Sequence, residues 1–135
     1  MNERTKRMLL VGGAVVLAIV FVMFGAGKFI DPAKWIDKFT AWGIPAWFVP
    51  VSGALEIAGA VGLLIPVLRG LAGLALALFM IGAVATHVVH AEIGMIFVAG
   101  AILAASATVG WLRLPETMAF VRRGVAGQPS TLSIE

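Results

Sequence analysis

Three ionisable side chains interrupt long apolar stretches of this chain: Lys28, Glu56 and His87. A carboxylate among apolar residues is costly unless it has a partner or stays protonated. A lysine can be its counter-ion, and a histidine can exchange a proton with a bound group near neutral pH. These residue types predict either a buried ion pair that fixes helix packing or a polar site that holds a ligand and moves a proton.

A metal site is the other chemistry that the histidines permit. His87 and His90 lie three residues apart on one helix face and could share a metal, with Glu56 or Glu92 as a third ligand. Lys28 argues against this interpretation, because a nearby cation repels a metal ion, so we predict no metal. The secondary candidates for ligand binding or hydrogen bonding are His90, Ser52 and Thr86.

The composition defines the class of protein that must position these residues. Of 135 residues, 61% are hydrophobic and 13% are charged, against about 45–50% and about 25% in ordinary soluble domains. So short a chain cannot bury that much apolar surface, which indicates an integral membrane protein. The absence of cysteine excludes disulfides and thiol chemistry. The basic residues lie at the ends of apolar runs, so we expect no nucleic-acid partner despite the net charge of +3.

The apolar runs predict an all-α membrane protein, a bundle of four transmembrane helices. Each run has about the 20 residues that a helix needs to cross a bilayer. The predicted spans are residues 8–29, 47–68, 70–90 and 92–112. We expect residues 1–114 to form the membrane domain and residues 115–135 a short polar tail in the cytoplasm.

Between the first two spans, residues 32–42 predict a short helix lying in the membrane interface. Pro32 suits the first turn of a helix, and aromatic residues recur at helical spacing on one face. We expect the aromatic face against the bundle or the lipid and the lysines toward water. The aromatic residues are Trp35, Phe39 and Trp42, and the lysines are Lys34 and Lys38.

The distribution of lysine and arginine predicts both termini in the cytoplasm and an inner (cytoplasmic) membrane location. Seven of these residues would then lie inside and three outside. The inner set is Arg4, Lys6, Arg7, Arg69, Arg113, Arg122 and Arg123, and the outer set is Lys28, Lys34 and Lys38.

This topology brings the three ionisable residues to one depth. Lys28 ends the first span, and Glu56 lies six residues after Pro50, about 9 Å from the outer end of its helix. His87 is seventeen residues into the third span, about 26 Å from the inner end. We therefore expect the side chains of Lys28, Glu56 and His87 to lie within hydrogen-bonding or one-water reach of one another.

The order of several short motifs resembles the DoxX and DoxX-like family of small four-helix membrane proteins, over roughly residues 9–112. These motifs are Gly25-Ala26-Gly27-Lys28-Phe29, Phe39-Thr40-Ala41-Trp42-Gly43-Ile44-Pro45, Glu56-Ile57-Ala58-Gly59-Ala60-Val61-Gly62-Leu63-Leu64-Ile65-Pro66, and Arg69-Gly70 followed by Met80, Ala83 and His87. The recurring lysine, glutamate and histidine of the family would map onto Lys28, Glu56 and His87. The resemblance implies a subunit of a thiosulfate:quinone oxidoreductase, a protein working beside redox or detoxifying enzymes, or a membrane chaperone.

Two functions remain open on this basis. The first is a quinone- or lipid-binding membrane subunit of a redox-associated complex, with the Lys28/Glu56/His87 cluster as its site and a quinone as its candidate cofactor. The chain has no electron carrier of its own, so we expect it not to be an enzyme alone and to need a partner membrane or redox protein. The alternative is a non-catalytic scaffold or chaperone for another membrane protein. The sequence leaves open whether the chain forms a homo-oligomer.

Overall fold

The computed structural model describes residues 1–127, and every regular element in that range is a helix. The helices are α1 (Glu3–Ile30), α2 (Pro32–Ala41), α3 (Phe48–Leu64), α4 (Arg69–Val89) and α5 (Ile93–Ala126). Three of them, α1, α4 and α5, are long and apolar enough to cross a membrane, and α3 is an apolar helix of 17 residues. The predicted all-α, multi-pass membrane protein is therefore confirmed.

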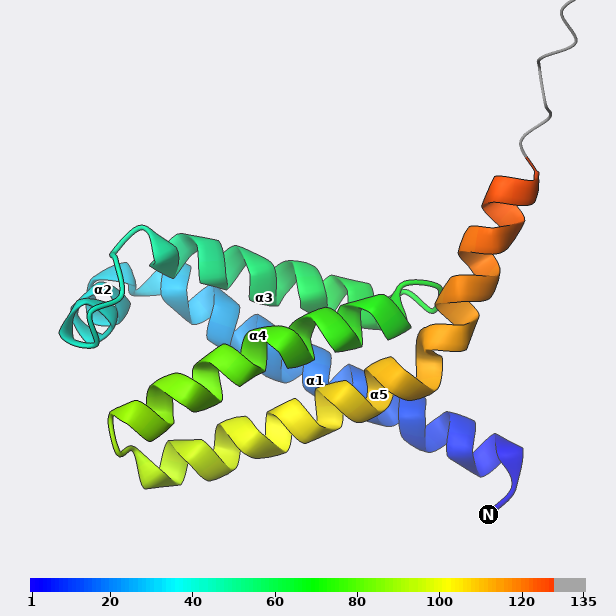
Figure 1. Cartoon of the computed structure of the whole chain (residues 1–135), viewed down its shortest axis with the longest axis horizontal. Helices are drawn as coiled ribbons and strands as arrows, with labels where there is room; N and C mark the ends of the chain where they lie inside the picture. Colours follow the sequence, from blue (N-terminus) through cyan, green and yellow to red (C-terminus); the bar gives the residue numbers. More distant parts are fainter. Residues whose placement is uncertain (128–135) are drawn as a thin grey trace, which may run out of the picture.

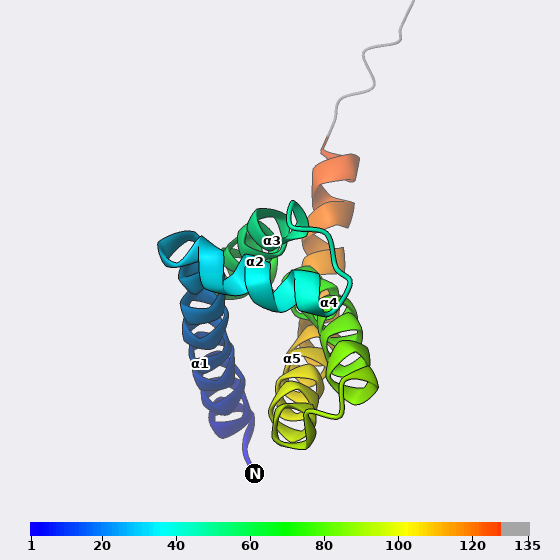
Figure 2. The same cartoon turned by 90° about the vertical axis from the view of Figure 1, so that its left-hand side faces the viewer.

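Four of the helices run lengthwise through the molecule as two packed pairs (Figure 1). Helix α1 packs against α3, α4 packs against α5 over most of its length, and α3 joins the pairs through α4, whereas α1 and α5 touch much less. Helix α2 lies across one end of this bundle (Figure 2). We call this the α2 end, and we call the opposite end, where Arg69 and Arg113 lie, the arginine end.

Glycine pairs set the spacing within each helix pair. A Cβ atom on Gly25 of α1 would lie 2.8 Å from the carbonyl oxygen of Gly53 in α3, and one on Gly53 would lie 3.0 Å from the carbonyl oxygen of Gly25. Between α4 and α5, a Cβ on Gly73 would lie 2.6 Å from the amide nitrogen of Gly110. Only glycine permits such close backbone approach, and close approach maximises the van der Waals contact that holds helices together in lipid.

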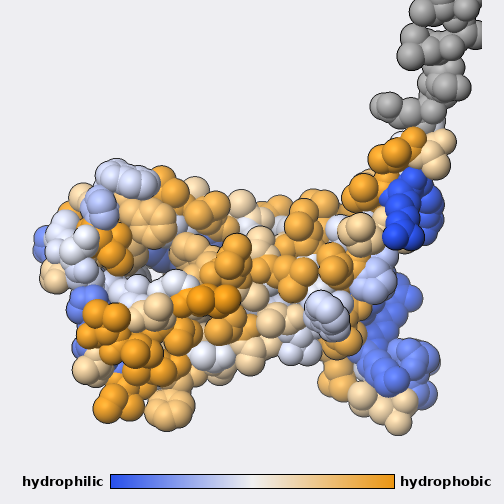
Figure 3. Space-filling view, viewed as in Figure 1, coloured by the Kyte–Doolittle hydropathy of each residue, from blue (hydrophilic) through white to orange (hydrophobic). Residues whose placement is uncertain are grey.

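The interior is a narrow column of apolar side chains, while the outside of the bundle is also apolar. Leu17, Phe21, Leu63, Leu76 and Met80 are buried where the helices meet. Large apolar side chains cover much of the exposed surface along the bundle, and hydrophilic residues gather toward its ends (Figure 3). This distribution suits a bundle surrounded by lipid along its length.

The start of helix α2 and the orientation of its side chains agree with the sequence prediction, except at Lys38. The Asp31 side chain accepts a hydrogen bond from the amide of Lys34, and Pro32 follows in the first turn. Phe39 is buried, and Lys34 is exposed. Lys38, expected to point to water, is instead half-buried, because its ammonium lies 4.7 Å from the Trp42 ring centroid.

The predicted polar tail is largely replaced by helix. Helix α5 continues through Pro115 to Ala126, and its direction changes sharply as it leaves the bundle (Figure 1). A proline inside a helix removes one backbone hydrogen bond and its ring pushes against the preceding turn, which is the physical cause of such a bend. Residues 128–135 of the expected tail lie outside the described residues.

Candidate functional site

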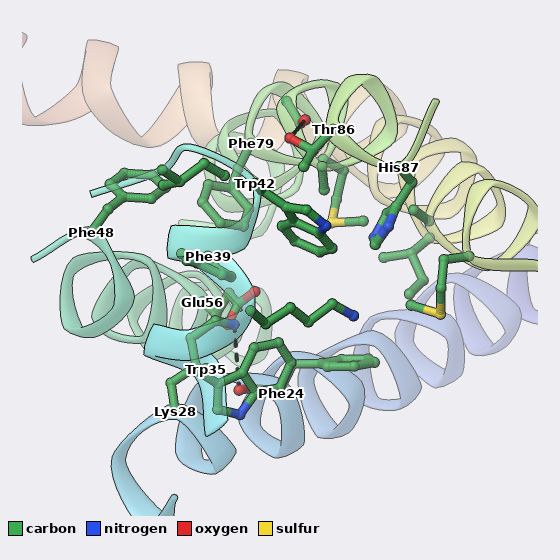
Figure 4. A pocket seen from close by; sticks show the side chains of 18 of the residues that line it. Phe24, Lys28, Trp35, Phe39, Trp42, Phe48, Glu56, Phe79, Thr86 and His87 are labelled. Atoms are coloured by element: carbon green, nitrogen blue, oxygen red, sulfur yellow. Dashed lines mark hydrogen bonds and ion pairs between the residues drawn. The ribbon is translucent and has the colours of Figure 1, made fainter. Parts of the chain in front are cut away.

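A cavity of about 390 Å³ lies at the α2 end, between the α1/α3 pair and the α4/α5 pair. Aromatic side chains of α2 form its cap, apolar side chains of α1, α4 and α5 form its deeper wall, and charged residues lie on opposite sides of it (Figure 4). All three residues of the predicted cluster line this cavity. The polar and aromatic lining includes Lys28, Glu56, His87, Lys38, Thr86, Trp35, Phe39 and Trp42.

The first polar side of the cavity is an ion pair between α1 and α3. The Lys28 ammonium donates to Oε2 of Glu56 at 2.6 Å, and both residues are almost completely buried, at 4% and 6% exposure. Lys28 also reaches the carbonyl oxygen of Phe24 at 3.5 Å and lies 4.7 Å from the Trp35 ring centroid. A Cβ atom on Gly25 would lie 3.2 Å from the Cβ of Glu56, and one on Gly53 would lie 3.3 Å from the Cβ of Lys28, so each partner faces the glycine of the other helix. The Lys28 side chain reaches back one turn along α1, toward Phe24, to meet Glu56.

His87 forms the second polar side, but with a different partner from the one predicted. Its Nδ1 atom lies 2.6 Å from Oε2 of Glu92, and Glu92 is also 3.8 Å from the Lys38 ammonium. Among the described residues no hydrogen bond or ion pair joins His87 to Lys28 or Glu56. Lys28, Glu56 and His87 therefore line one cavity, with Lys28 and Glu56 in direct contact and His87 hydrogen-bonded to Glu92.

The turn between α4 and α5 brings Glu92 back to His87. Ala91 has a positive φ of 55°, and the amide of Glu92 donates to the carbonyl oxygen of His87 at 3.0 Å. The amide of Ala91 donates to Val88, which completes the hydrogen-bond pattern of a helix ended by one left-handed residue. An alanine in the left-handed region costs about 1–2 kcal/mol. At Ala91 this conformation turns the chain back, so that the Glu92 side chain faces His87 in the last turn of α4.

The secondary candidates have mostly local roles. Thr86 lines the cavity, and its hydroxyl donates to the carbonyl oxygen of Gly82. Ser52 is buried and donates to Val49, and it is not part of the cavity wall. The ring of His90 packs against Trp42, with the ring centroids 5.4 Å apart. Within residues 1–127 no three histidine, aspartate or glutamate side chains come together in a way that could hold a metal ion.

The aromatic cap of the cavity is not evident from the sequence. The sequence predicts Trp35, Phe39 and Trp42 against the bundle or the lipid, and in the structure they line the cavity. Trp42 contacts the ring of His87 edge-on at 5.5 Å between centroids. From the sequence, Glu92 is a possible metal ligand or part of a solvated turn after His90. Glu92 lies five residues after His87 and beyond the end of α4, so helical spacing does not predict that the two side chains meet. Their contact depends on the turn at Ala91.

The fold and the site together define a multi-pass helical membrane protein with an internal cavity lined by aromatic and ion-paired side chains. The model of the DoxX-like family matches residues 13–109, which includes the first four helices from Gly13 onward and half of α5. The chain belongs to this family. Searches among curated proteins and among solved structures found no match.

Proposed function

We propose that this chain crosses the inner membrane four times and binds the polar head of a quinone in the cavity at the α2 end, as a subunit working beside a redox partner. Helix α3 would be the fourth span. Its 17 helical residues extend about 25 Å, and the apolar residues 65–68 that follow continue toward the headgroups. Helix α2 would lie in the outer interface, with its aromatic face on the bundle.

The observation that carries the quinone proposal is the arrangement of the cavity wall. A quinone head is a flat ring with carbonyl groups on opposite edges, and the cavity offers flat aromatic surfaces between two polar sides. The Lys28 ammonium is the donor suited to one carbonyl, and His87 is the group suited to the other (Figure 4). The volume of about 390 Å³ is within the range of about 300–1,000 Å³ usual for small-molecule sites.

The ion pairs also supply a route for protons. Reduction of a quinone to a quinol takes up two electrons and two protons, and in this proposal a partner redox protein supplies the electrons. Glu92 is half-buried and connects His87 to the surface at the α2 end. When the imidazole is protonated, Nδ1 of His87 donates to Glu92 and Nε2 donates to the ligand carbonyl. The imidazolium can then pass its Nε2 proton to the ligand and regain a proton through Glu92.

The weak contact between α1 and α5 offers the ligand an entrance from the lipid. The cavity wall includes Phe21 and Phe24 on α1 and Val98 and Ala99 on α5, and Val98 is exposed at the outer surface. A quinone whose head occupies the cavity could leave its apolar tail between these two helices, in the hydrocarbon region. Entry from the side would not require α2 to move.

The test is retention of quinone by protein purified in mild detergent, measured by extraction and chromatography. Ala99 is buried in the cavity wall, so Ala99→Phe should fill the space and reduce retained quinone at least about tenfold. The matched control is Ala101→Phe, two residues along the same helix on its exposed face, which should retain quinone like the parent. No quinone in the parent, or equal retention in both variants, would contradict the proposal.

The second candidate, a scaffold for a partner membrane protein, is favoured by a groove on the bundle's outer face. Small residues and larger apolar side chains together line this groove between α3 and α4, with a volume of about 330 Å³. Such a surface suits a transmembrane helix of the partner, because small residues permit close backbone approach. A stoichiometric partner in the purified complex with no retained quinone would support this function instead. The lining residues with small side chains are Ala58, Gly59, Gly62, Ala72 and Ala75.

A further inference from the structure

Two buried arginines meet at the arginine end, far along the bundle from the cavity. Arg69 begins α4 and is 6% exposed, and Arg113 lies in α5 and is 7% exposed. A Cβ atom on Gly70 would lie 2.6 Å from the Cα of Leu114 and 2.7 Å from the carbonyl carbon of Arg113. This close approach of α4 and α5 places the two guanidinium groups in one region, where each is in the electrostatic field of the other.

The hydrogen bonds of these arginines are unequally satisfied. Arg69 caps the end of α3, since its Nε donates to the carbonyl of Leu63 at 2.7 Å and its Nη2 to that of Leu64 at 3.4 Å. Arg113 pairs with Glu116 through Nη1 alone. Its Nε and Nη2 atoms, and the Oγ1 atom of Thr117 one turn further along, are buried and have no hydrogen-bond partner among the described residues.

The unpartnered edge of Arg113 has a specific chemical preference. Nε–H and the nearer N–H of Nη2 point in parallel, which is the geometry that binds two oxygens of a phosphate or carboxylate. Leaving these donors buried without acceptors is costly. The charges agree with an anionic ligand, because Arg7, Arg69 and Arg113 act on this region with Glu116 as the acidic counterpart. Three arginines against one glutamate leave this region with an excess of positive charge.

The part of α5 beyond Pro115 indicates that the anion belongs to a membrane lipid. Met118, Val121 and Val125 form an exposed apolar row at i, i+3 and i+7, with Arg122 along its edge and Arg123 on another face of the helix. A helix with an apolar row and adjacent arginines suits the boundary between acyl chains and headgroups. Hydrophilic surface is concentrated at this end of the molecule (Figure 3). A phosphate of a membrane lipid is the anion found in that boundary layer.

We propose that Arg113, supported by the charge of Arg69 and the hydroxyl of Thr117, binds the phosphate of an anionic phospholipid at the arginine end. The flexible stem of Arg113 lets its guanidinium turn toward the surface, as arginines near a membrane interface do. The lipid phosphate then takes the two donors that lack partners. The helix beyond Pro115 lies in the same headgroup layer and inserts its apolar row beside the acyl chains of that lipid.

Native mass spectrometry from detergent containing equal amounts of phosphatidylglycerol and phosphatidylcholine tests this assignment. We expect the parent protein to retain phosphatidylglycerol about tenfold over phosphatidylcholine. Arg113→Gln should abolish this preference, and Arg113→Lys should reduce it, since lysine keeps the charge without the paired donors. Lys6→Gln is the control: it removes one charge from an exposed residue of the terminal segment that carries Arg7, and should leave the preference unchanged.

Three results would overturn the proposal. They are no lipid preference in the parent, a preference that survives Arg113→Gln, and an equal loss in Lys6→Gln. A separate arm adds inorganic phosphate to the parent: if millimolar phosphate displaces the lipid and alone raises the melting temperature, the site takes free phosphate and the lipid assignment is wrong. If Arg113→Gln does not fold by circular dichroism, Arg113→Lys and Thr117→Val decide, with lower retention in both expected.

Discussion

The Lys28 ammonium has three kinds of partner inside the bundle: a carboxylate, a backbone carbonyl and an aromatic ring. Glu56 accepts at 2.6 Å, Phe24 at 3.5 Å, and the Trp35 ring centroid is 4.7 Å away. A buried ion pair is not by itself a source of stability, because removing both charges from water costs about as much as their attraction returns. The partners of Lys28 do, however, hold its ammonium at a fixed place in the cavity wall, where it can donate a hydrogen bond to a ligand.

This balance gives a prediction for the pair. Lys28→Met or Glu56→Gln alone should destabilise the protein by about 3–5 kcal/mol, because each leaves one buried charge without its partner. The double variant should cost less than the sum and fold about as well as the parent. Unfolding in mixed micelles, analysed as a double-mutant cycle, measures the coupling. Additive losses would show that the two side chains do not interact in the folded protein.

The double variant also separates the two interpretations of the pair. If the pair only fixes helix register, the refolded double variant should retain whatever small molecule the parent retains. If the pair belongs to a binding site, the double variant should fold and lose that molecule. The measurement is the same extraction that tests the cavity with Ala99→Phe.

At the scale of the helices, the close contact between α1 and α3 is what brings Lys28 to Glu56. Gly25→Leu would place a side chain where a Cβ already lies 2.8 Å from the Gly53 carbonyl oxygen. Overpacking of this kind costs about 1–3 kcal/mol, and the helices should separate enough to weaken the ion pair. Thermal unfolding measures the first effect, and retained ligand measures the second.

The control for this experiment lies on the same helix. A Cβ on Gly12 would meet nothing within 4 Å, so Gly12→Leu adds the same side chain without a clash. It should leave stability unchanged or raise it slightly, because leucine favours helix more than glycine does. Equal damage from both substitutions would mean that the Gly25/Gly53 contact does not set the helix spacing.

The helices were predictable from sequence to a large extent, because length and apolar composition are local properties. Residues 32–42 were expected to form a short helix, and α2 spans Pro32–Ala41. The end of α5 was not predictable in this way: the sequence predicts a tail from residue 115, whereas the helix bends at Pro115 and continues to Ala126. Proline is tolerated inside helices when other contacts hold the flanking turns.

The site was predictable only in part, for a similar reason. Lys28 and Glu56 stand out because a charge in an apolar span needs a partner, and the number of candidates is small. The partner of His87 depends on a single left-handed residue at Ala91, which is not a sequence pattern. Sequence spacing places His87 on the wall of the cavity but does not reveal its contact with Glu92.

At the scale of the whole molecule, charge is distributed unequally between the two ends. The α2 end carries Lys28 and Lys38 in ion pairs with Glu56 and Glu92. The arginine end and the terminal segments carry seven basic residues, of which Arg69 and Arg113 are buried. Since basic residues resist translocation, this asymmetry favours a cytoplasmic arginine end and an external α2 end.

Single cysteines test this orientation without interference, because the chain has none of its own. Thr5→Cys in α1, Ala46→Cys between α2 and α3, and Gly127→Cys after α5 all lie at exposed positions. In intact cells a membrane-impermeant maleimide should label Ala46→Cys alone, and the other two should react only after the membrane is permeabilised. If Thr5→Cys and Gly127→Cys react from opposite sides, the chain crosses an odd number of times and α3 is not a span. If both react from outside and Ala46→Cys does not, the charge asymmetry does not set the orientation, and the cavity would open toward the cytoplasm.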